Sequence, residues 1–228
     1  MAENANAKET GLEAKQRIEA ENLKTYLTEE EVKSDFFMEM AITLQSAEAK
    51  RLFRRTFEHI QTQITAATIL TRKFGLRELS DENVQKINES LDHLAKEMSR
   101  DMAQADHILE EVGIKMSAET EDKVDILVKI TCPQGMAFMN LVRQLDTLST
   151  KFKTLWMSGE LTLAQSEDRA HAWQIRIFKT ADAIRALGQQ AYIASDKKKE
   201  ADQQKAQAKR QAFKGRQQGA AKAAAGAT

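Results

Sequence analysis

The sequence contains one pattern of apolar positions twice, and this repeat constrains the fold more than any single motif. Each copy has a short alternating segment, a long helix-forming stretch, a glycine and a second long stretch. A strand–helix–helix unit that occurs twice can pair its two strands into a small antiparallel ribbon, with the helices packed behind it. The positions matched at an offset of about 88 residues are Met38, Met40 and Ile42 with Ile126, Val128 and Ile130, and Phe53, Phe57, Ile60 and Ile64 with Leu141, Leu145, Leu148 and Phe152.

Two segments have the period of two that is typical of half-buried strands. In residues 36–44 the apolar side holds Phe36, Met38, Met40, Ile42 and Leu44. In residues 123–131 the β-branched residues Val124, Ile126, Val128 and Ile130 form the inner side, and β-branched residues favour strands. The first segment could also begin the next helix, because Met, Ala and Glu are helix formers. The side chains expected to point outward are Phe37, Glu39, Ala41, Thr43, Asp125, Leu127, Lys129 and Thr131.

The sequence predicts four long helices for the rest of the core, and the protein is therefore expected to be mostly α. Capping residues and glycines set the expected helix ends, since Ser, Thr and an early Pro favour helix starts and Gly favours helix ends. Apolar spacing places Trp156 and Trp173 in the core. The expected helices are about 47–74 after Ser46, from Ser80 to Gly113, from Pro133 to Met157, and about 163–193 after Thr162.

Charge divides the chain into three parts. Residues 1–34 are polar and mostly acidic, and we expect a mobile arm. Residues 35–194 are long enough for a helical core domain with the ribbon. Residues 195–228 are rich in Gln, Ala, Lys and Gly, and we expect a disordered basic tail. The formal net charge of zero is therefore a cancellation between the two ends, and the basic end can attract an anion.

Several functional classes find no support in the sequence. The single cysteine, Cys132, excludes a disulfide framework within the chain and favours the cytoplasm. The polar N-terminus has no secretory signal, and no stretch is apolar enough for a membrane span. The histidines have no metal-ligand spacing, and no glycine-rich phosphate loop is present. We therefore expect no enzyme, no metal and no cofactor. The four histidines are His59, His93, His107 and His171.

Two groups of basic residues are candidate phosphate contacts. The first group shares one arc of the helix at 47–74 and is offset from the apolar stripe of that helix; its alternative interpretation is an ordinary solvated face. The second group lies in the tail, where it would add affinity for nucleic acid without sequence reading; its alternative interpretation is a solubilising end. The residues are Lys50, Arg51, Arg54 and Arg55 in the helix, and Lys197, Lys198, Lys199, Lys209 and Arg210 in the tail.

The outward face of the ribbon is the candidate for sequence reading. In a ribbon that enters a major groove, Lys and Thr can donate hydrogen bonds to base edges, and Thr can contact a thymine methyl group. In the alternative interpretation, another part of the protein covers this face, which would account for Phe37 and Leu127. The candidate residues are Thr43, Asp125, Leu127, Lys129 and Thr131.

Several stretches resemble the AcaB-like proteins of conjugative plasmids and integrative conjugative elements. They are Met40–Phe53, Val124–Thr131, Pro133–Asp146 and Leu161–Ala164 with the helix to Leu187. The resemblance covers about residues 38–190. It implies a fold related to ribbon-helix-helix DNA binders and a transcriptional activator of transfer genes. Ribbon-helix-helix units are usually small and pair between two chains, whereas here the helices are longer and both units lie in one chain.

Together these features predict a sequence-specific DNA-binding activator of conjugative-transfer genes. Double-stranded DNA is the expected partner, RNA polymerase and a second copy of the chain are further candidates, and no membrane is involved. The alternative is a non-enzymatic helical adaptor or structural protein of the conjugation machinery. Its acidic arm and basic tail would then serve protein contacts.

Overall fold

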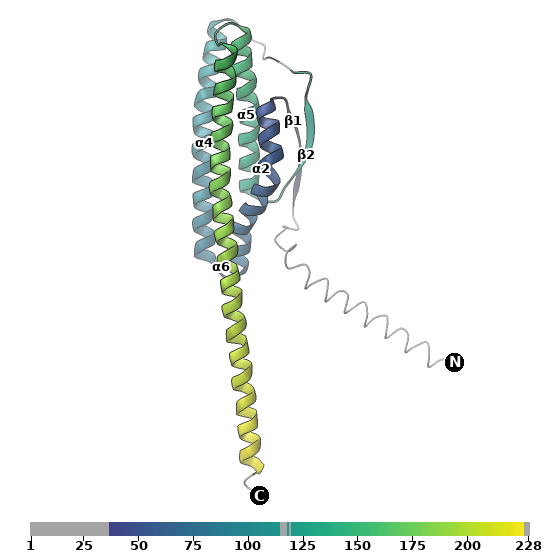
Figure 1. The fold of residues 1–228 in the computed structure, drawn as a ribbon, viewed down its shortest axis with the longest axis vertical. Coiled ribbons are helices and arrows are strands. Elements are labelled where there is room, and N and C mark those ends of the chain that lie inside the picture. The colour runs from purple at the N-terminus through teal and green to yellow at the C-terminus, as the bar shows by residue number, and fades with distance from the viewer. Residues whose placement is uncertain (1–36, 115–117, 119, 226–228) are drawn as a thin grey trace, which may run out of the picture.

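The computed structural model describes residues 37–114, 118 and 120–225, with side chains as far as residue 209. Four long helices form an elongated bundle, and a two-stranded ribbon lies along one side of it (Figure 1). The predicted arm at 1–34 lies outside the described residues. The elements are β1 (Met38–Leu44), α2 (Ala47–Thr65), the π-helix η1 (Ala66–Leu70), α3 (Thr71–Lys73), α4 (Arg77–Glu111), β2 (Val124–Ile130), α5 (Pro133–Met157) and α6 (Leu163–Ala225).

The two strands pair antiparallel, as the sequence predicts. Met38 lies opposite Ile130, Ala41 opposite Leu127 and Leu44 opposite Val124. The two strands share one pattern of exposure along their seven residues, in which the fifth and seventh residues are buried. Antiparallel pairing brings the four buried positions onto one face, which packs on the helices because burial of apolar side chains stabilises the fold. These inner residues are Ile42, Leu44, Val128 and Ile130.

The structure corrects the offset of the repeat from about 88 to 86 residues. The first residue of β2 lies 86 positions after that of β1, and Pro133 lies 86 positions after Ala47, the first residue of α2. The error of two residues preserved the inner and outer sides, because side chains in a strand alternate with a period of two. At the corrected offset, Ala41 and Leu127 are both repeat equivalents and pairing partners. A local two-fold axis therefore passes between them.

A π-helical turn interrupts the helix expected at 47–74. A residue that was predicted to cap the following helix contacts this turn instead. The turn Ala66–Leu70 has carbonyls that accept from α4: Asn83 Nδ2 donates to Ala67 O at 3.0 Å, and Ser80 Oγ donates to Thr68 O at 2.7 Å. Ser80 is thus a buried residue inside α4, which begins at Arg77. Its prediction as an N-cap is wrong, because α4 begins before it and its hydroxyl donates a hydrogen bond to a carbonyl of η1.

The last helix begins as expected but continues far past 193. The Oγ1 of Thr162 accepts from the N–H of Gln165 at 3.2 Å, and Gln165 Oε1 accepts from the N–H of Thr162 at 2.9 Å, which is a capping box. The expected helix end at 193 is wrong, because the backbone is helical to Ala225 and runs beyond the bundle (Figure 1). Ala, Gln, Lys and Glu are strong helix formers, and no proline interrupts them. Its buried side chains end at Ser195 within the described part.

The core has one tryptophan where two were expected. Trp173 on α6 is 4% exposed, as predicted, whereas Trp156 near the end of α5 is 41% exposed. The prediction for Trp156 is wrong, because its neighbour Leu155 occupies the buried position in that turn. Among the described helices, none is both long and apolar enough to cross a membrane.

Candidate nucleic-acid interface

The outer face of the ribbon is open to solvent. Glu39 lies opposite Lys129, Ala41 opposite Leu127 and Thr43 opposite Asp125. All six side chains are exposed, so no described element covers the face. Thr131 does not belong to it, because this residue follows β2, is half-buried and donates its backbone N–H to Gln61 Oε1 at 3.1 Å. The face therefore holds four of the five predicted ribbon residues.

Charges on this face are paired across the strands. Lys129 Nζ lies 3.7 Å from Glu39 Oε1 and 4.7 Å from the centre of the Phe37 ring. Thr43 Oγ1 donates to Asp125 Oδ1 at 2.6 Å. With two carboxylates and one ammonium, the face does not itself attract phosphate. Its polar groups can still bind base edges, which present both donors and acceptors.

Apolar side chains are also prominent on the ribbon, and one of them was unexpected. Phe37, Met38 and Leu127 are 53%, 60% and 63% exposed. The alternation of the strand places Met38 inward, but Met38 begins β1 and lies at the open end of the inner face. An open apolar hollow of about 460 Å³ lies there, lined by Phe37, Met38, Ile130, Thr131, Cys132, Pro133 and Met136.

The basic cluster of α2 lies near the opposite end of the ribbon. Lys50 Nζ donates to the carbonyl of Asp122, which lies two residues before β2 begins. Arg51, Arg54 and Arg55 are exposed. The three arginines thus lie in the first three turns of α2, and this helix begins next to the end of the ribbon that holds Thr43 and Asp125. The equivalent positions of α5 at the offset of 86 are uncharged: Met136, Ala137, Asn140 and Leu141.

Two side chains hold the junctions where the strands enter their helices. The carboxylate of Asp146 on α5 accepts from the backbone N–H groups of Gln45 and Ser46. Gln61 on α2 donates to Lys129 O at 2.9 Å and accepts from the N–H of Thr131. Each helix thus fixes the junction of the other unit. The sequence did not predict this arrangement, although Asp146 is the only acidic residue within α5 and falls at the helical spacing of the apolar residues of that helix.

The basic residues of the tail lie away from the ribbon. Lys197, Lys199 and Lys209 are exposed on the part of α6 that extends beyond the bundle, and Lys198 Nζ lies 3.6 Å from Asp202 Oδ1 (Figure 1). The side chain of Arg210 lies outside the described part. The structure does not bring these bases together with the α2 cluster, so the two groups would contact different stretches of a nucleic acid.

No metal-binding cluster of three or more His, Cys, Asp or Glu side chains occurs in the described part of the chain. Cys132 is 8% exposed, and burial raises the pKa of its thiol above the ordinary value. A buried thiol with a raised pKa is a poor nucleophile, because the thiolate is the reactive form.

Comparison with known proteins supports one assignment. No protein-family model matches the sequence, and no curated protein matches it significantly. Among solved structures, the chain is similar to selenomethionine-containing AcaB from uropathogenic E. coli, with 26% sequence identity and a TM-score of 0.70. The match covers 75% of this chain and 88% of that chain. Because most of both chains share the fold and the residue identity extends over the same region, the comparison supports a relationship of this protein to an AcaB-like family.

Proposed function

We propose that this protein is a DNA-binding regulator of a mobile element that reads duplex DNA with the outer face of its β1–β2 ribbon. The observation that carries the proposal is the antiparallel ribbon itself, whose outer face is exposed along both strands. A two-stranded ribbon fits the major groove, where each base pair presents a distinct pattern of donors and acceptors.

The chemistry of the face suits base edges better than phosphates. Lys129 and Thr43 can donate to purine or thymine oxygens, and Glu39 and Asp125 can accept from cytosine amino groups. Leu127, at the local two-fold axis, can contact thymine methyls. On binding, each of these polar groups exchanges its partner across the ribbon for a partner on DNA, which limits the net gain in binding free energy. A mismatched sequence offers no such replacement partner, so the exchange favours matched sequences.

A ribbon that reads sequence must also be held rigidly. The Asp146 and Gln61 contacts hold both strand–helix junctions against the bundle. Side chains held on a rigid scaffold lose less entropy when they bind. The two strand–helix–helix units of one chain would thereby supply what ribbon-helix-helix proteins assemble from two chains.

Phosphate contacts would come from the α2 cluster. Arg51, Arg54 and Arg55 are exposed beside one end of the ribbon, and basic groups near a groove-reading element position it on the duplex. The exposed lysines of α6 would add sequence-independent affinity farther along the DNA. The ribbon would then bind in one preferred orientation, because the equivalent turn of α5 has no charge.

The regulatory part of the proposal rests on the AcaB-like family and on the resemblance to regulators of transfer genes. An activator of conjugative-transfer genes would work in the cytoplasm, without a cofactor or an enzymatic step, and would contact RNA polymerase as well as DNA. A second copy of the chain could occupy an adjacent half-site, although the ribbon itself is complete in one chain.

A salt series with random-sequence duplex DNA tests the proposal. Three phosphate contacts by the α2 cluster contribute about −2.7 to the slope of log K against log salt concentration, and the α6 lysines add to it. Replacing Arg51, Arg54 and Arg55 together by Gln should make the slope less negative by about that contribution. The matched control replaces three exposed lysines of the bundle, Lys96, Lys153 and Lys179, by Gln and should leave the slope unchanged. Binding that is absent at low salt would refute the proposal.

One observation favours a second function, a helical adaptor of the conjugation machinery. The exposed apolar side chains of Phe37, Met38 and Leu127 share the ribbon region, and large exposed apolar groups often mark protein contacts. An adaptor would show almost no affinity for DNA in the same salt series. Its binding to a partner would fall when Leu127 is replaced by Ser.

A further inference from the structure

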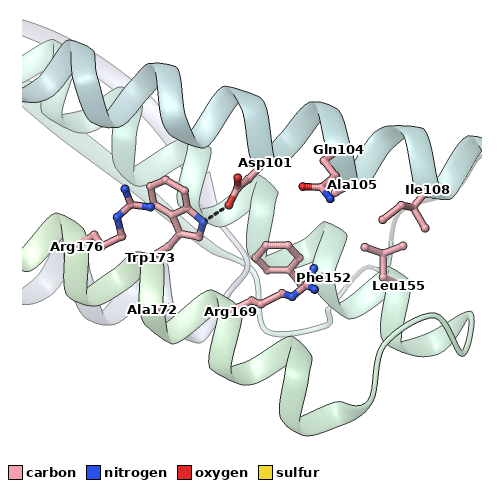
Figure 2. A pocket seen from close by; sticks show the side chains of 10 residues that line it. All are labelled: Asp101, Gln104, Ala105, Ile108, Phe152, Leu155, Arg169, Ala172, Trp173 and Arg176. Carbon is pink, nitrogen blue, oxygen red and sulfur yellow. Dashed lines mark hydrogen bonds between the residues drawn. The ribbon is translucent and has the colours of Figure 1, made fainter.

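A second candidate site lies in the bundle, away from the ribbon. A cavity of about 300 Å³ opens between α4 and α6, with α5 at its base (Figure 2). Sites between the helices of a bundle are common places for small ligands, and this volume is at the lower end of the range for them. Its lining residues are Asp101, Gln104, Ala105, Ile108, Phe152, Leu155, Arg169, Ala172, Trp173 and Arg176.

Small side chains create the space, and aromatic side chains line it. Ala105 on α4 and Ala172 on α6 leave room between the two helices. Phe152 and Trp173 are 3% and 4% exposed, so their rings are held by the core. Trp173 Nε1 donates to Asp101 Oδ2 at 2.8 Å, which fixes the indole (Figure 2). The cavity is therefore preformed and can accept a flat apolar group.

The two arginines of the cavity differ in their partners. Arg176 lies 4.1 Å from the centre of the Trp173 ring and forms an ion pair with Glu97. Arg169 lies 6.0 Å from the centre of the Phe152 ring and forms no ion pair with any described side chain. Its charge is thus available beside an aromatic wall, where a guanidinium can bind a carboxylate through two parallel hydrogen bonds.

We propose that this cavity binds a small aromatic carboxylate. The ring would lie against Phe152 and Ile108, and the carboxylate would pair with Arg169. The position of Asp101 sets this orientation, because a ligand carboxylate near the Asp101 carboxylate would be repelled. A single free guanidinium matches a single carboxylate better than a multiply charged phosphate. This site goes beyond DNA binding and does not depend on it.

The fluorescence of Trp173 provides a direct test. In a Trp156→Phe background the remaining tryptophan lies in the cavity wall, and Trp156 is exposed enough for the change to be tolerated. Benzoate, indole-3-acetate and 2-naphthoate serve as probes. We expect saturable quenching by at least one of them at submillimolar to millimolar concentration, together with a raised melting temperature.

Three variants separate this site from nonspecific binding. Arg169→Gln should weaken binding about tenfold, which corresponds to about 1.4 kcal/mol. Ala172→Leu should abolish binding by filling the space, and its exposed position allows the fold to persist. Lys179→Gln removes a charge from α6 outside the cavity and should change nothing. The proposal is overturned if no probe saturates, or if Arg169→Gln and Ala172→Leu bind as well as the parent protein.

Discussion

The carboxylate of Asp146 on α5 accepts a hydrogen bond of 2.6 Å from the backbone N–H of Ser46, the residue that caps α2. The same carboxylate accepts from the N–H of Gln45 at 3.0 and 3.1 Å. These groups are 100 and 101 residues apart in the chain. The contact joins the two repeated units at the point where the first strand becomes a helix.

Replacing Asp146 by Ala should therefore destabilise the whole core. The change leaves two backbone N–H groups without an acceptor, and lost hydrogen bonds to a charged group cost about 1.5–3 kcal/mol. Urea unfolding measures the free energy of unfolding. Asp146→Asn keeps one acceptor oxygen and should cost less. Thr147→Ala, at the exposed neighbouring position, should cost less than about 0.5 kcal/mol. Equal losses for Asp146→Ala and Thr147→Ala would contradict the role of the carboxylate.

Gly188 on α6 allows a close approach to α2. A Cβ atom at this position would lie 2.3 Å from Gln63 Oε1, 2.8 Å from Gln63 Cβ and 2.9 Å from the backbone O of Gln63. In an exposed helix a change from Gly to Ala stabilises by about 1 kcal/mol. Here the contact with the backbone of α2 should reverse the sign, and Gly188→Ala should destabilise by about 1–3 kcal/mol in urea unfolding. A variant that is more stable than the parent protein would show that α6 can move away from α2 without cost.

Burial should also control the reactivity of Cys132. The folded state raises the pKa of its thiol, chiefly through desolvation. The stabilising contribution of the protonated thiol is present below its ordinary pKa and is lost as the pH rises through the folded-state value. At pH 8 a thiol reagent such as 5,5′-dithiobis(2-nitrobenzoate) should react slowly with the native protein and rapidly in urea. Equal rates in both conditions would mean that the N-terminus of α5 opens freely.

Much of the fold follows from sequence, because the decisive signals are local. Alternation of β-branched residues gave the inner and outer sides of β2, and Thr162 and Gly159 gave the break between α5 and α6. The errors arose where a distant group decides the local structure. Ser80 has the residue type of a cap, but it donates to Thr68 in another helix. The spacing of apolar residues in the sequence does not distinguish a π-helical turn from the α-helix around it.

The candidate interface was only partly predictable for the same reason. The strand period placed Thr43, Asp125, Leu127 and Lys129 on the exposed face, but it could not show that Lys129 already contacts Glu39 and Phe37. These contacts depend on the antiparallel register. The register in turn depends on which offset relates the two units, and the apolar residues of the strands match at both 86 and 88.

The basic extension of α6 should contribute affinity without sequence preference. Deleting residues 197–228 removes nine basic residues, so affinity should fall for all duplexes alike and the dependence on salt should become weaker. The melting temperature of the core should stay within a few degrees, because the described side chains from residue 196 onward are exposed or half-buried. Fluorescence anisotropy and thermal unfolding measure the two effects. A collapse of the melting transition would show that the extension is structural.

The most direct test of the central claim compares two DNA duplexes with one variant, Lys129→Ala. A duplex selected by the protein from a random pool is compared in gel shifts with a scrambled duplex of the same composition, and Lys153→Ala serves as an exposed control. If the ribbon reads base edges, Lys129→Ala should weaken binding to the selected duplex by about 1–3 kcal/mol and binding to the scrambled duplex much less. Equal losses on both duplexes would make Lys129 a phosphate contact. No loss on either duplex would mean that the ribbon does not face DNA, which contradicts the account.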